Sequence, residues 1–98
     1  MAQATLTPKA QYVNGVLDDY KKNRISQSEI GKLAAALHKY FLSLQTDRER
    51  DYFEILINRY IVKAPLSLEE LADLYGSSKN NIKSWEINKG ILALSEFY

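Results

Sequence analysis

The sequence predicts an all-α protein, a single domain of five or six helices that ends in a C-terminal helix-turn-helix. Apolar residues recur at the three- to four-residue spacing of an amphipathic helix, and no segment shows the sustained alternation of a half-buried strand. A Ser or Thr followed by Glu three residues later, the signature of a helix N-terminus, occurs at three places. Hydrophobic residues make up 46% of the 98 positions and charged residues 26%, which is enough apolar surface for one small folded domain.

The first 45 residues are predicted to form an N-terminal extension of two helices. The first helix spans about residues 8–22, with Thr7 as its N-cap and Pro8 at the first helical position, where the fixed φ of proline is favourable. The second begins after Ser26, which is expected to form a capping box with Glu29. The apolar face expected for this second helix consists of Ile30, Leu33, Ala34, Leu37, Phe41 and Leu44.

The region 46–98 is predicted to begin with the central helix of the fold. A capping box between Thr46 and Glu49 starts this third helix, which is apolar on much of its circumference and runs to about Val62. Pro65 then separates it from the next helix, because proline restricts the residue before it to extended conformations.

Two further helices follow with a sharp turn between them. Ser67 caps a short fourth helix, and Gly76 ends it. The fifth helix is expected to begin near Ser78, to turn Ile82 and Trp85 inward, and to end over residues 88–90, where a glycine can take the left-handed cap conformation. Residues 91–98 could then form a short sixth helix.

Composition argues against several classes of function. The chain has no cysteine and one histidine, so it offers no thiolate or histidine cluster for a metal, and we expect no cofactor. It has no glycine-rich phosphate loop and no local pairing of a nucleophile with a base, so we expect neither an enzyme nor a small-molecule substrate. The acids at positions 47, 49, 51 and 54 alternate with Arg48 and Arg50, which favours an ion-paired surface over a metal site.

We expect the protein to be located in the cytoplasm. No apolar run reaches the roughly 18 residues that cross a bilayer. The first residues, MAQATLTPKAQ, lack the basic and apolar regions of a signal peptide. We therefore expect no membrane partner.

The most informative stretch is the pair of helices around Gly76. The chain must reverse within three or four residues, which favours glycine, and Ala72 is small enough for the two helices to pack closely. In a helix-turn-helix the second helix enters the DNA major groove, and the first crosses the phosphate backbone.

The same stretch, SLEELADLYGSSKNNIKSWE, resembles region 4 of bacterial sigma factors, and the preceding TDRERDYFEILINRYI is similar to the helix before that region's motif. The resemblance covers residues 46–94 and implies a transcription regulator of phage or plasmid type that recognises specific DNA sequences. Carried over by position, it implies six DNA-facing residues: Ser67, Lys79, Asn80, Asn81, Lys83 and Ser84. This sequence has no arginine at the positions where the family pattern has them, so readout would depend on Lys charge and on Asn, which can pair with adenine.

The distribution of charge keeps a second interpretation open. The net charge is only +1; residues 1–45 carry six Lys/Arg against three Asp/Glu, and residues 46–98 carry seven against nine. A C-terminal half of net charge −2 favours an interaction module that docks on RNA polymerase or another regulator, with weak or no DNA binding. The candidate partners are therefore duplex DNA, RNA polymerase and, through the first two helices, either a second copy of the chain or another protein.

Overall fold

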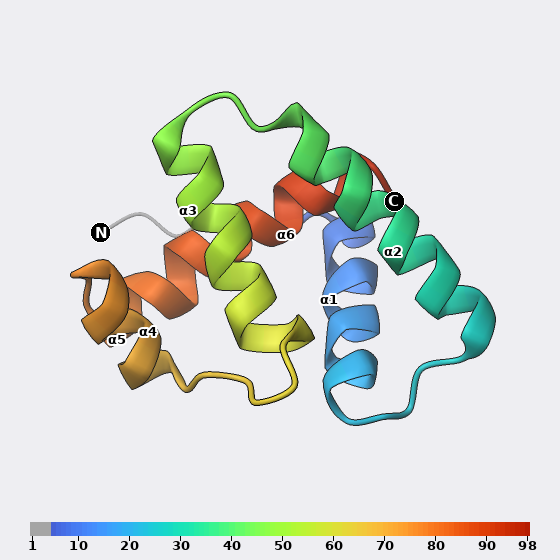
Figure 1. The fold of residues 1–98 in the computed structure, drawn as a ribbon, viewed down its shortest axis with the longest axis horizontal. Helices are drawn as coiled ribbons and strands as arrows, with labels where there is room; N and C mark the ends of the chain where they lie inside the picture. The colour runs from blue at the N-terminus through green and yellow to red at the C-terminus, as the bar shows by residue number, and fades with distance from the viewer. Residues whose placement is uncertain (1–4) are drawn as a thin grey trace.

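The computed structural model describes residues 5–98, and within that range the chain forms five helices and no strands (Figure 1). Residues 1–4, the first part of the segment MAQATLTPKAQ in which we expect no signal peptide, lie outside the described range. The fold measures 35 × 26 × 24 Å along its principal axes. Two of the five helices contain a π-helical turn, so their segments carry separate labels. The bounds are α1 Pro8–Lys21, α2 Gln27–Ser43, α3 Asp47–Leu56 continued by η1 Ile57–Ile61, α4 Leu68–Tyr75, and a last helix made of α5 Lys79–Asn81, η2 Ile82–Glu86 and α6 Ile87–Ser95.

Side-chain caps start the helices where the sequence predicted them. The hydroxyls of Thr7, Thr46 and Ser67 each accept a hydrogen bond from the backbone N–H three residues later, at 3.1 Å. The capping boxes at Thr46 and Ser67 are complete. The box expected at Ser26 is only half formed, because the Glu29 carboxylate accepts from the hydroxyls of Tyr12 and Tyr98 instead of returning to the Ser26 backbone. This contact ties the last residue of the chain to the start of α2.

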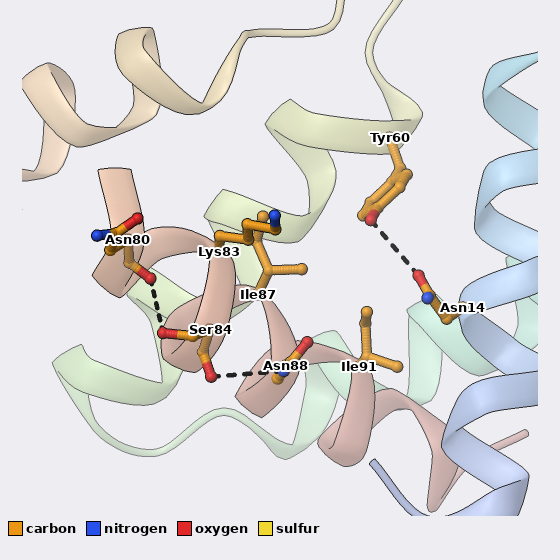
Figure 2. A pocket seen from close by; sticks show the side chains of 8 residues that line it. All are labelled: Asn14, Tyr60, Asn80, Lys83, Ser84, Ile87, Asn88 and Ile91. Atoms are coloured by element: carbon orange, nitrogen blue, oxygen red, sulfur yellow. Dashed lines mark hydrogen bonds between the residues drawn. The ribbon is translucent and has the colours of Figure 1, made fainter. Parts of the chain in front are cut away.

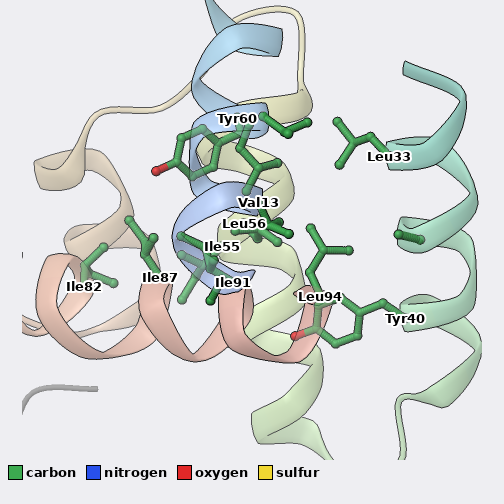
Figure 3. Close-up of a cluster of buried hydrophobic side chains, with 14 of the residues drawn as sticks. Val13, Leu33, Tyr40, Ile55, Leu56, Tyr60, Ile82, Ile87, Ile91 and Leu94 are labelled. Atoms are coloured by element: carbon green, nitrogen blue, oxygen red, sulfur yellow. The ribbon is translucent and has the colours of Figure 1, made fainter. Parts of the chain in front are cut away.

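All five helices contribute to one hydrophobic core, and α6 crosses the centre of it against α1, α2 and α3 (Figures 1 and 3). The first two helices are therefore part of the same packed body as the C-terminal half. The fully buried side chains include Val13, Leu17, Leu33, Ile55, Leu56, Leu71, Ile82, Ile91 and Leu94.

The face predicted for α2 was partly wrong. Leu33 is buried as expected, but its buried companions are Ala36 and Tyr40, while Ile30 is 40% exposed and Phe41 57% exposed. Both faces of α2 carry apolar residues, so helical spacing alone could not select the inward one. The face that carries Tyr40 is the inward one, because the Tyr40 ring packs edge-on against Phe53 and nearly parallel to Phe97.

The expected end of the fifth helix at residues 88–90 was also wrong, since the helix continues through Gly90 to Ser95. Gly90 is buried where α6 crosses α3, and a Cβ atom there would lie 3.0 Å from the carbonyl oxygen of Tyr52. The glycine thus permits close contact between two helices and caps neither of them.

A π turn also changes which side of the last helix faces the core. The Ile87 N–H donates to the carbonyl of Ile82, five residues earlier. The wider turn brings these two side chains, which an α-helix would place on different sides, to the same inward face. Trp85, predicted to point inward with Ile82, is instead half-buried at the side of the helix.

Candidate nucleic-acid interface

A tight turn joins α4 to the last helix and sets their relative position. Gly76 has φ +63°, the left-handed conformation that favours glycine. The Ser77 N–H then donates to the Ala72 carbonyl at 2.9 Å, and the Ser78 hydroxyl caps α5 by accepting from the Asn81 N–H at 3.0 Å. Ala72 is buried between the helices, as predicted. The chain therefore forms two helices joined by a tight turn at the predicted place, and the start of the second helix lies at the surface.

Three of the six predicted DNA-facing residues, Asn80, Lys83 and Ser84, line one open groove of about 510 Å³, which we call the Lys83 groove. Figure 2 shows this groove between the last helix on one side and α1 with the end of η1 on the other. The remaining lining residues are Asn14, Tyr60, Ile87, Asn88 and Ile91.

Internal hydrogen bonds determine what each polar side chain can offer a ligand. The Ser84 hydroxyl donates to the Asn80 carbonyl at 2.7 Å, so its proton is engaged within the helix and its oxygen can only accept (Figure 2). The Asn80 side chain is exposed and retains both its donor and its acceptor. The exposed Lys83 has no carboxylate within 4.0 Å in the described part of the chain. From the last helix, the groove thus presents the Lys83 cation and the Asn80 amide to a ligand.

The other three predicted residues lie elsewhere. The Lys79 ammonium is 3.7 Å from the carboxylate of Glu69 on α4, and both groups are exposed. The Asn81 side chain donates to the Ser77 hydroxyl at 2.8 Å and turns away from the Lys83 groove. Ser67 is exposed, but its backbone N–H already donates to the Glu70 carboxylate at 2.9 Å, the position where a phosphate would otherwise bind.

Asn81 belongs instead to a second depression between the last helix and α3, lined also by Arg48, Tyr52, Trp85 and Glu86. The Trp85 indole N–H donates to the Tyr52 hydroxyl at 3.2 Å, and the Lys89 ammonium lies 4.7 Å from the Trp85 ring centroid. These contacts hold Trp85 as a packing residue.

Glu86 is the least satisfied group in this depression. Its Oε2 atom is buried without a hydrogen-bond partner, and partial burial raises the pKa of the carboxyl, opposed by a hydrogen bond with Ser77. Asp51 and Glu86 outnumber Arg48 in this lining, whereas Lys83 is the one charged residue in the described lining of the Lys83 groove, so the two sides of the last helix differ in electrostatic character.

Sequence reasoning missed the far wall of the Lys83 groove. The Tyr60 hydroxyl donates to the Asn14 side-chain oxygen at 3.5 Å, which leaves the Asn14 amide nitrogen to face a ligand. Asn14 comes from α1 and Tyr60 from η1, 46 residues apart in the chain. The one available sequence signal was the Asn14-Gly15 pair, two poor helix formers inside a helix.

Within residues 5–98 there is no group of three or more acidic or histidine side chains that could hold a metal ion, and no helix has the length and apolar character needed to cross a membrane. Comparison of the chain with protein-family models, with curated proteins and with solved structures found no match.

Proposed function

We propose that this protein is a DNA-binding transcription regulator that places the start of its last helix in the major groove and recognises a specific sequence. The observation that carries the proposal is the joint exposure of Asn80 and Lys83 beside the left-handed turn at Gly76. The turn presents the helix end, Lys83 supplies a charge for phosphate, and Asn80 has the donor and acceptor that match an adenine edge.

We expect the predicted contact residues to contribute unequally to DNA binding. Lys79 is already paired with Glu69, and Asn81 with Ser77, so each must give up an internal partner to contact DNA. Lys83 and Asn80 need give up none. We therefore expect Lys83→Gln to weaken binding to every duplex more than Lys79→Gln does.

The proposal is tested by fluorescence-anisotropy titration with random-sequence duplex DNA at several salt concentrations. Wild-type binding should weaken as salt rises, and Lys83→Gln should flatten the salt slope by about 0.9, the value of one phosphate contact. Lys39→Gln, an exposed lysine on α2, is the matched control and should leave the slope unchanged. After a binding site has been selected from random DNA, Asn80→Ala should cost about 1–3 kcal/mol at that site only. Absence of wild-type binding even at low salt would overturn the proposal.

A second function, docking on RNA polymerase, is favoured by a different observation. The exposed surface of α4 is acidic at Glu69 and Asp73 and carries Leu74, which is 62% exposed. An apolar side chain within an acidic surface suits a basic protein partner better than it suits DNA. Purified RNA polymerase should then bind the wild type, and Leu74→Ser should bind at least ten-fold more weakly, while Leu42→Ser on α2 should not differ from the wild type.

A further inference from the structure

A second groove lies next to the Lys83 groove, and Tyr60 borders both of them. We call it the Lys21 groove; its polar and aromatic lining residues, Tyr20, Lys21, Asn23, Tyr60 and Lys63, come from the ends of α1 and η1 and the segments that follow them, and the other five lining residues are apolar. It is open to solvent and has a volume of about 500 Å³. Tyr60 is the one residue common to the two linings, so the two grooves lie side by side, one toward the last helix and the other toward the far end of α1.

The charged residues that line the two grooves are lysines, and none of them has a carboxylate of residues 5–98 within ion-pair distance. The Lys21 ammonium lies 5.9 Å from the Tyr60 ring centroid. Of the described residues, only Lys32, Arg50 and Lys79 have a carboxylate within 4.0 Å, so Lys21, Lys63 and Lys83 have none at that distance. The charges of these three lysines are available to an anion.

The surroundings of Lys21 disfavour the charged form of its side chain. Partial burial lowers the pKa of Lys21, and the nearby Arg59 lowers it further, while Asp18 acts in the opposite direction. The Arg59 guanidinium is held in place by donating to the Leu66 carbonyl at 3.1 Å. A bound anion would relieve the repulsion between these two cations.

We propose that the Lys21 groove binds backbone phosphates of the same duplex whose major groove receives the last helix, with Lys21 and Lys63 as the phosphate contacts. This inference rests on the proposed DNA-binding function. The position of this groove beside the Lys83 groove, with Tyr60 in both linings, favours DNA over an acidic protein segment. DNA contact would thereby extend to α1, outside residues 46–98.

The test compares two charge-matched double variants in the anisotropy assay. Lys21→Gln combined with Lys63→Gln should flatten the salt slope by about 1.8, since each lysine accounts for about 0.9. The control, Lys32→Gln combined with Lys39→Gln, removes two exposed lysines of α2 and should keep the wild-type slope. Circular dichroism of both variants checks that the fold is retained.

The outcomes separate this inference from the proposed function. If Lys83→Gln flattens the slope and the Lys21/Lys63 variant does not, the groove is not a DNA contact, while the helix-turn-helix still is. If the wild type fails to bind DNA at low salt, both proposals fall. If the Lys21/Lys63 variant keeps the wild-type DNA slope but loses binding to a polyglutamate peptide, the groove binds acidic protein segments and the DNA assignment is overturned.

Discussion

Replacing Gly90 with alanine tests the central packing contact of the fold. Alanine inside an exposed helix is more stable than glycine by about 1 kcal/mol, because glycine loses more backbone entropy on folding. At Gly90 the added Cβ would lie 3.0 Å from the Tyr52 carbonyl oxygen and 3.5 Å from the Leu56 Cβ. The first of these atoms belongs to the backbone of α3, so it cannot rotate away.

The magnitude follows from these two opposing effects. Overpacking a well-filled core costs about 1–3 kcal/mol, and subtracting the helix-propensity gain of about 1 kcal/mol leaves a net destabilisation of about 0–2 kcal/mol. Gly31 on α2 supplies the control, because nothing lies within 4 Å of a Cβ added there and the residue is exposed. Gly31→Ala should therefore stabilise the protein by about 0.5–1 kcal/mol.

Urea unfolding followed by circular dichroism measures both variants. The free energies of unfolding of Gly31→Ala and Gly90→Ala should differ by about 1–3 kcal/mol, the cost of the contact between α3 and α6. In a domain of this size each kcal/mol shifts the Tm by about 4–8 °C, so thermal unfolding gives an independent check. If Gly90→Ala stabilises the protein as much as Gly31→Ala does, the reasoning about close helix contact is refuted.

Three further predictions follow. Gly76→Ala should lower the free energy of unfolding by about 1–2 kcal/mol through backbone strain alone, since φ is +63° and the added Cβ meets no atom within 4 Å; stability equal to the wild type in urea unfolding would contradict this. The pKa of Glu29 is lowered because the hydroxyls of Tyr98 and Tyr12 donate to its carboxylate. The stabilisation by this carboxylate is therefore present above the usual glutamate pKa and is lost as the pH falls through the lower pKa of the folded state. The difference in the free energy of unfolding between wild type and Glu29→Gln should shrink over that pH range, and a constant difference would rule the mechanism out. Glu69→Gln should free Lys79 and steepen the salt slope of DNA binding by about 0.9, whereas Asp47→Asn at the start of α3 should leave the slope unchanged, and equal effects of the two would mean that only net charge matters.

The parts of the fold that depend on neighbouring residues could be predicted from the sequence. The caps at Thr7, Thr46 and Ser67 join groups three residues apart, and the turn at Gly76 depends on the φ of one residue. The role of Gly90 could not be predicted from its neighbours in the sequence. The same residue type that caps a helix also permits close contact between helices, and only the position of Tyr52, 38 residues earlier, distinguishes the two roles.

In the candidate site, too, the features set by neighbouring residues could be predicted, and those set by helix packing could not. The sequence placed Asn80, Lys83 and Ser84 on the exposed start of a helix, and the structure brings these three into one groove. The pairing of Lys79 with Glu69 depends on how α4 lies against α5, which local patterns do not encode. Asn14 and Tyr60 were missed for the same reason, since the groove that they complete forms only when α1 packs against η1 and α6.

The distribution of charge around the last helix limits how a duplex can approach it. On the α4 side, Glu69 and Asp73 are exposed and Glu69 already neutralises Lys79, so phosphates are repelled there. On the α3 side, two acids, Asp51 and Glu86, line the depression together with one cation, Arg48, so this side offers phosphate no excess of positive charge. The side toward α1 carries Lys83 and then Lys21, neither of which is paired with a carboxylate. A duplex that follows the most favourable electrostatic path therefore lies over α1, which would make the first helix part of the recognition surface.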